Sequence, residues 1–175
     1  MAVVYLQEGT RVTFELANTV PILREEYVSP GVGTVTVKGI FNQSAHIETT
    51  DGTRFRTLQP RKDRDRPDQL TYPVVYLPSK DPAFRLLSPL EYAGSGRIPR
   101  LRFTTALDDQ SYLFKPISAD QRAFDLWDGM ETVRLVTRER GGSFILDATV
   151  LAPVPSVLVL LFPWLDSQIV PQRRS

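Results

Sequence analysis

The sequence predicts a mainly β protein, built from an antiparallel sheet of short, hairpin-connected strands that closes into a barrel or a sandwich. Apolar and polar residues alternate along several short segments, which is the period of a strand with one buried face. Pairs of turn-forming residues separate these segments, and the chain contains 14 prolines. Closure of such a sheet removes exposed strand edges, so we expect a barrel or a sandwich.

The alternation is clearest in four segments. In the first of them Val12, Phe14 and Leu16 share one face of an extended strand. In the third, Phe103 and Leu107 share a face and polar side chains point the opposite way. The four segments are residues 11–16, 34–41, 100–107 and 132–138.

Tight turns are expected at dipeptides that tolerate a positive φ. These are Asp51-Gly52, Asp128-Gly129 and Gly141-Gly142, and the adjacent Asp108 and Asp109 also indicate a turn. Residues 118–126 are the only other helical candidate besides the C-terminal run, with Ser118 as a cap and Gln121 as its capping-box partner.

A single domain is expected for residues 1–175, because this length is typical of one core. The only possible boundary is residues 60–69, which carry four basic and three acidic side chains and are typical of a solvated surface loop. The interleaved acidic groups argue against a nucleic-acid-binding arm, because they offset the release of counterions from phosphates.

The chain lacks residues that several kinds of catalytic site require. The chain has no cysteine, which excludes disulfides, cysteine nucleophiles and thiolate metal sites, and His46 is its only histidine. No G-x-S-x-G motif accompanies His46, so the simpler interpretation is that His46 is a strand residue near a hairpin without a catalytic role. We therefore expect no metal and no cofactor, and an enzyme with an unrecognised acid-base site stays an alternative.

Residues 94–102 are a candidate anion-binding segment, because a glycine pair is followed there by Arg97, Arg100 and Arg102. Backbone amides of a glycine turn and guanidinium groups can together hold a phosphate. The spacing fits no established phosphate-binding motif, so a loop followed by a strand with a polar outer face is the competing interpretation.

The C-terminal run from Val157 to Leu165 is interrupted only by Pro163. It is too short to span a bilayer, and it fits a buried strand, a helix that is apolar all round, or an exposed patch. Ser156 is a fair N-cap for a helix, whereas a proline in the interior of that helix would cost about 3 kcal/mol or more. The run is compatible both with a kinked helix and with a strand that is followed by a helical turn.

Residues 112–153 followed by the apolar PSVLVLLFPWLDSQIV resemble the tubby-like C-terminal superfamily, which includes LURP-one-related proteins and phospholipid scramblases. Members wrap a closed antiparallel barrel around one hydrophobic C-terminal helix. The resemblance implies that the run is this helix and lies inside the barrel. The core residues expected on this basis are Val157, Leu158, Leu160, Leu161, Phe162, Trp164 and Leu165.

The resemblance also implies a non-enzymatic binding module for phosphoinositide or other anionic lipid head groups, or a scaffold of unknown ligand. The expected location is cytoplasmic, with peripheral contact at a membrane and no transmembrane segment or nucleic-acid partner. Candidate ligand residues, chosen for their polar strand faces, are Arg97, Arg100, Arg102, Arg134 and Arg138. The alternative is an interaction subunit of a larger assembly, which docks a protein partner through residues 157–165 or residues 72–77.

Overall fold

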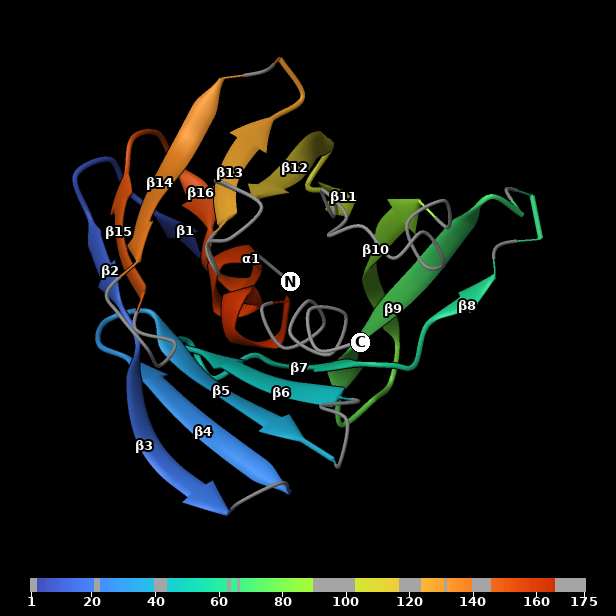
Figure 1. Ribbon diagram of the computed structural model, residues 1–175, viewed down its shortest axis with the longest axis horizontal. Coiled ribbons are helices and arrows are strands. Elements are labelled where there is room, and N and C mark those ends of the chain that lie inside the picture. The colour runs from blue at the N-terminus through green and yellow to red at the C-terminus, as the bar shows by residue number, and fades with distance from the viewer. Residues whose placement is uncertain are drawn as a thin grey trace.

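The computed structural model describes most of the chain as one curved antiparallel sheet around a short helix (Figure 1). The description covers residues 3–20, 23–39, 44–62, 64–65, 67–89, 103–116, 124–130, 132–139 and 146–165.

The strands are short and follow one another through tight connections. Their bounds are β1 (Tyr5–Leu6), β2 (Arg11–Thr13), β3 (Glu15–Val20), β4 (Arg24–Ser29), β5 (Gly33–Lys38), β6 (Ser44–Thr49), β7 (Arg54–Thr57), β8 (Arg61–Lys62), β9 (Gln69–Leu77), β10 (Pro82–Pro89), β11 (Phe103–Leu107), β12 (Gln110–Pro116), β13 (Phe124–Asp128), β14 (Val133–Glu139), β15 (Leu146–Val150) and β16 (Val154–Pro155). The helix α1 (Ser156–Leu160) follows β16 directly.

The sheet is nearly closed into a barrel, because its two ends are consecutive in the chain. The strands are ordered β2-β15-β14-β13-β12-β11-β10-β9-β7-β6-β5-β4-β3, with β8 paired to β9 beside this path. Only Phe14 separates β2 from β3, and its side chain is buried. The prediction of a mainly antiparallel β fold with a C-terminal helix is therefore confirmed.

The expected first strand is divided at Phe14. Val12 and Phe14 are buried, but Leu16 on the same face is 52% exposed. The reason is a change of partner: β2 pairs with β15, whereas β3 pairs with β4 and shifts register between Leu16 and Asn18. All six residues of β3 are exposed, so this part of the sheet extends beyond the core.

The core is formed by the inward side chains of the strands and by the helix that they surround. Val35 and Val37 of β5 and Ala45 and Ile47 of β6 are buried, while the residues between them are only partly buried. Figure 1 shows α1 in the middle of the barrel. This alternation is the expected result of a sheet with one face toward the core.

The C-terminal run is helical, broken at Leu161. Residues 156–160 form α1, and residues 162–165 return to helical conformation, with the Leu165 amide donating to the Leu161 carbonyl at 2.9 Å. Pro163 lies in the first turn of the second segment, where its missing amide is tolerated. Ser156 does not cap α1: Pro155 holds that position, and the Ser156 amide donates to the Val4 carbonyl at 2.8 Å.

Every residue from Ser156 to Leu165 is buried. Aromatic contacts tie the run to the barrel wall, with ring centroids 5.5 Å apart for Trp164 and Tyr72 and 5.7 Å apart for Phe162 and Phe114. Full burial stabilises each large apolar side chain by about 1.5–3 kcal/mol, so the run is a large part of the core.

Two local expectations need correction. Residues 124–126 belong to β13 and not to a helix, because Phe124 and Leu126 pair with Pro116 and Phe114 of β12; the rest of that candidate lies outside the described residues. In the loop of residues 60–69, β8 pairs with β9, although both of its side chains are exposed.

The turns at Asp51-Gly52 and Asp108-Asp109 are found, with positive φ at Gly52, Asp108 and Asp109. A turn at Gly129 and Met130 follows Asp128 at the expected place, but Gly129 does not have a positive φ. Gly141-Gly142 lies outside the described residues.

Gly33 allows the helix to approach the sheet. Its φ is +150°, and a Cβ atom there would lie 2.2 Å from the Glu48 carbonyl oxygen and 2.8 Å from Leu160 Cδ1. We expect Gly33→Ala to lower the free energy of unfolding by at least about 3 kcal/mol, since backbone strain and overpacking add. Denaturant unfolding followed by circular dichroism measures this loss.

Gly31→Ala is the matched control. Gly31 also has a positive φ, of +73°, but nothing lies within 4 Å of its Cβ position. Its cost should be only about 1–2 kcal/mol from the left-handed backbone. Equal losses in the two variants would contradict the close packing of α1 on β5.

Candidate functional site

The interior of the barrel is occupied by the chain's own C-terminal run, whose residues from Ser156 to Leu165 are all buried. A ligand would therefore have to bind at the outer surface or in a cavity between the helix and the strands. Among the described residues, three features meet this condition: a small cavity beside α1, a groove on the wall of β8 to β12, and a cluster of cations on the outer faces of β5 to β10.

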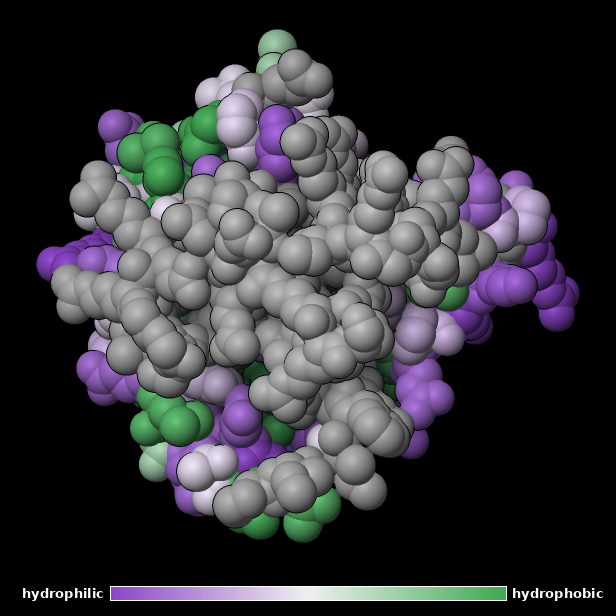
Figure 2. Space-filling model, viewed as in Figure 1, coloured by the Kyte–Doolittle hydropathy of each residue, from purple (hydrophilic) through white to green (hydrophobic). Residues whose placement is uncertain are grey.

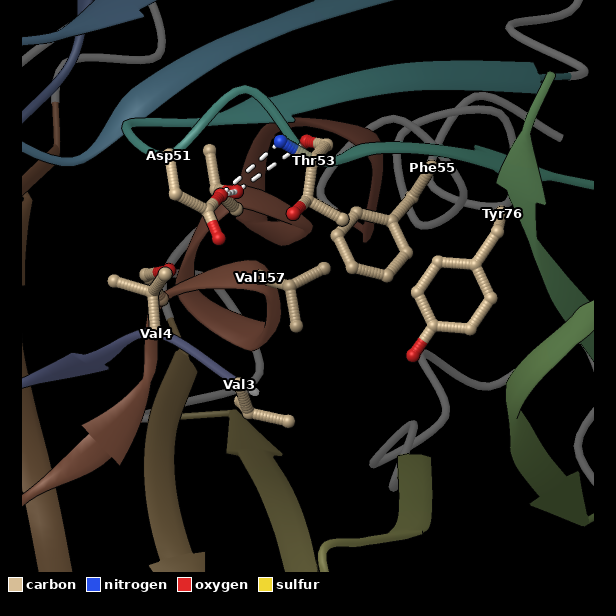
Figure 3. Close-up of a pocket in the computed structure, with 9 residues that line it drawn as sticks. Val3, Val4, Asp51, Thr53, Phe55, Tyr76 and Val157 are labelled. Carbon is tan, nitrogen blue, oxygen red and sulfur yellow. Dashed lines mark hydrogen bonds between the residues drawn. The ribbon is translucent and has the colours of Figure 1, made fainter. Parts of the chain in front are cut away.

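The small cavity lies beside the beginning of α1 (Figure 3). Val3, Val157, Phe55 and Tyr76 line it, and its volume is about 20 Å³. Such a space holds about one water molecule, so it does not suit an organic ligand. At its rim Asp51 accepts from the Thr49 hydroxyl and from the Thr53 amide, which together lower the pKa of the Asp51 carboxyl.

The groove is much larger, about 970 Å³, and lies where β10 and β11 separate. These two strands pair only at Leu86 and Leu87, and the Thr105 hydroxyl donates to the Arg85 carbonyl at 2.7 Å beyond the last pair. The side chains that line it come mainly from the outer face of the sheet; the apolar ones include Leu58, Pro73, Val75, Pro82, Ala83, Leu87 and Leu113.

Polar groups are also present in the groove. Arg61 and Arg85 line it, and both are exposed. Thr71 is 4% exposed, and its hydroxyl has no hydrogen-bond partner in the described part of the chain. Thr71 lies opposite Arg61 on β8 and opposite Leu87 on β10, so a cation, a hydroxyl and an apolar side chain are neighbours across three strands.

Cations gather on the strands from β5 to β10. Among these residues Glu48 is the only carboxylate. The cations are Lys38, Arg54, Arg56, Arg61, Lys62 and Arg85. We call this set the basic wall. None of the six is buried, whereas the neighbouring inward residues Val37, Phe55 and Phe84 are, so the cations point away from the core.

The other strands are more balanced in charge. Strands β11 to β15 contain Lys115, Arg134 and Arg138 together with Asp125, Asp128, Glu139 and Asp147. In Figure 2 hydrophilic residues project at the right of the molecule over β8, which is part of the basic wall. The charge asymmetry is thus a property of one side of the barrel.

Of the five ligand residues expected from the sequence, Arg134 and Arg138 lie in the described strands. Arg97, Arg100 and Arg102 lie outside the described residues. Arg134 donates through Nε to Asp128 at 3.0 Å and through Nη1 to the Pro153 carbonyl at 2.6 Å. Arg138 lies on β14 opposite Asp147.

Arg134 therefore has a structural role. Asp128 also accepts from the amides of Met130 and Thr132, which fixes the turn after β13. Burial by itself would raise the pKa of Asp128, but the Thr132 amide, the Arg134 guanidinium and the Met130 amide together lower it. The carboxylate and the guanidinium are held by each other and by the backbone.

The basic wall was missed in the sequence. Its signal is present in RFRT and in AFRLL, where cations alternate with inward apolar residues. His46 also lies on this side, on β6 between Thr36 and Arg56. It lines neither the groove nor the small cavity, so neither space joins it to a carboxylate in the way that an acid-base site requires.

In the described part of the chain, no group of three metal-binding side chains is close enough to hold a metal ion. Among the described residues, no helix has the length and apolarity that crossing a bilayer requires. Comparison of the chain with family models, with curated proteins and with solved structures found no match.

The ion pair of Arg134 should contribute more to the free energy of unfolding than the ion pair of Arg11. We expect Arg134→Gln to lower the free energy of unfolding by about 1–3 kcal/mol, because Asp128 loses a partner in a largely buried place. The loss should shrink as the pH falls through the lowered pKa of Asp128, since a protonated carboxyl no longer attracts the guanidinium. Denaturant unfolding at several pH values measures both effects.

Arg11→Gln provides the control. Arg11 pairs with Asp147 at 2.8 Å, but its side chain is 63% exposed, so water replaces the interaction and little stability is lost. A larger loss in Arg11→Gln than in Arg134→Gln would contradict the structural role of Arg134.

Proposed function

We propose that this protein is a non-enzymatic binding module that attaches to anionic lipid head groups through the basic wall. The main observation that supports this proposal is that six cations and one carboxylate lie on neighbouring strands of one side of the barrel. Each Lys or Arg near an anionic membrane surface contributes about 1 kcal/mol of attraction. A surface with this excess of cations therefore favours an anionic partner over a neutral one.

The groove adds an apolar component to the same side. Arg61 and Arg85 belong to both the groove and the basic wall, next to Pro73, Val75 and Leu87. An amphiphile has the matching arrangement, with an acidic head and an apolar chain. This combination supports a lipid more than a small inorganic anion alone.

The resemblance of the C-terminal third to the tubby-like superfamily is a second reason for the proposal, because that resemblance implies a lipid-binding module. It does not identify the contact residues. Among the arginines expected from the sequence, Arg134 is engaged by Asp128 and Pro153, so the proposal uses the basic wall.

Docking of a protein partner is a second candidate, favoured by β3. Its six residues are all exposed, and among the described strands it pairs with β4 alone. Leu16, Val20 and Leu23 are 52%, 44% and 53% exposed, and hydrophobic residues appear at the outer ends of β3 and β4 in Figure 2. An unpaired strand edge can accept another strand. The buried residues 157–165 do not offer such a surface.

Binding to vesicles tests the lipid proposal. We expect the protein to sediment with vesicles of phosphatidylcholine and phosphatidylserine at low salt and to be released at high salt. It should not bind to vesicles of phosphatidylcholine alone. Arg54→Gln combined with Arg61→Gln should weaken this binding about 30-fold, because two exposed cations of the basic wall are lost.

A variant with the same change in net charge is the control. Arg11→Gln combined with Arg24→Gln removes two exposed cations that lie outside the basic wall, on β2 and β4, and are paired with Asp147 and Glu26. It should retain most of the binding. Equal weakening in the two double variants would mean that net charge and not the basic wall is responsible, and binding that does not depend on phosphatidylserine would refute the proposal.

A further inference from the structure

We propose that Lys38, His46 and Arg56 form a binding site for a phosphate-type oxyanion, and that protonation of His46 strengthens this site. The inference rests on the proposed function only where the phosphate belongs to a lipid head group. A free phosphate ester has the same chemistry and would bind to the same three side chains.

The strand register places these side chains together. His46 on β6 lies directly opposite Arg56 on β7 and opposite Thr36 on β5. Residues paired in this way have Cβ atoms about 4.5–5.5 Å apart. Lys38 lies opposite Ser44, which precedes His46 by two residues on the same face, so the Lys38 side chain is a diagonal neighbour of His46.

All three side chains face outward. The residues beside them in the chain, Val37, Ala45, Ile47, Phe55 and Thr57, are buried at 0–7% exposure, and alternation along each strand directs the three to the opposite face. Lys38, His46 and Arg56 are themselves only partly buried, so an anion can reach them from solvent.

Within the described ranges, neither Lys38 nor Arg56 belongs to an ion pair. Pairs of this kind are found instead at Arg11, Arg24 and Arg134. The Nε atom of Arg56 is shielded from water and has no hydrogen-bond partner among the described residues. A guanidinium carries further N–H groups, and an oxyanion that binds them would give this cation a charge-assisted partner.

The charges around His46 are mainly positive. Lys38 faces it from β5, Arg54 and Arg56 face it from β7, and Glu48 on its own strand lies opposite Arg54. Burial, followed by the positive charges of Lys38 and Arg56, lowers the pKa of His46. On β4, beyond Thr36, Glu26 is paired with Arg24 at 3.0 Å and is already partly compensated.

A bound anion would offset the repulsion from Lys38 and Arg56, which lowers the pKa of His46 in addition to the effect of burial. Above the lowered pKa, Lys38 and Arg56 hold the anion alone; below it, His46 adds a third positive charge and a further N–H donor. Linkage then requires that acid raise the affinity for the anion and that the anion raise the pKa of His46. A phosphate with two negative charges and several acceptor oxygens suits three converging donors better than a carboxylate does.

The test uses the fact that His46 is the only histidine, so its imidazole signals in an NMR spectrum need no assignment. The pKa of His46 is measured in chloride and then in inorganic phosphate or glycerol phosphate at equal ionic strength. We expect each phosphate to raise this pKa by about one unit, which corresponds to tenfold tighter binding by the protonated form. An unchanged pKa would overturn the inference.

Variants separate a site from general charge effects. Lys38→Gln and Arg56→Gln should each raise the pKa of His46 in chloride, because a repelling cation is removed, and should each abolish most of the further rise caused by phosphate. Lys38→Gln leaves the shielded guanidinium in place, so it stays informative if Arg56→Gln unfolds. Arg11→Gln, on the distant β2, should leave both titrations as in the unmodified protein. A full phosphate effect in Lys38→Gln and Arg56→Gln would contradict the site.

Vesicle binding distinguishes this inference from the proposed function. Retention on phosphatidylserine vesicles with no phosphate effect on His46 would refute the site and keep the basic wall as a lipid-binding surface. A phosphate effect on His46 without retention on vesicles would support the site for a free phosphate ester and refute the lipid proposal.

Discussion

The structure depends on the burial of one apolar segment at the C-terminus. Residues from Ser156 to Leu165 cannot remain in water without a large loss of hydrophobic stabilisation, and a single layer of sheet covers only one side of a helix. A sheet that curves around the helix covers all sides at once. The aromatic contacts of Trp164 and Phe162 with two different strands, and the absence of a side chain at Gly33, show how closely the wall fits.

This constraint determines where binding can occur. Many β-barrels hold a ligand inside, but here the interior is filled by the helix, so the outer face of the strands is the surface that can vary without disturbing the core. The basic wall and the groove lie on that face. Because strands alternate between inward and outward residues, cations can be added on neighbouring strands while the buried partners stay apolar.

Arginines in this chain have two different roles, and burial separates them. Arg134 is largely buried and fixes a turn through Asp128, whereas Arg54 and Arg61 are exposed and have no such partner among the described residues. The first kind stabilises the fold, and the second kind is available to an anion. Residue type alone does not make this distinction, which is why Arg134 looked like a ligand residue in the sequence.

The sequence by itself determined the β class, the turns at Asp51-Gly52 and Asp108-Asp109, and the unusual apolarity of the last segment, because these depend on local period and local backbone preference. Tertiary structure decided the rest. Leu16 is exposed since the chain changes partner at Phe14, residues 124–126 join a strand since β12 is beside them, and the basic wall forms only when β5 to β10 are aligned in register. The local patterns RFRT and AFRLL show that cations alternate with inward apolar residues, but a local pattern does not specify which distant strands become neighbours.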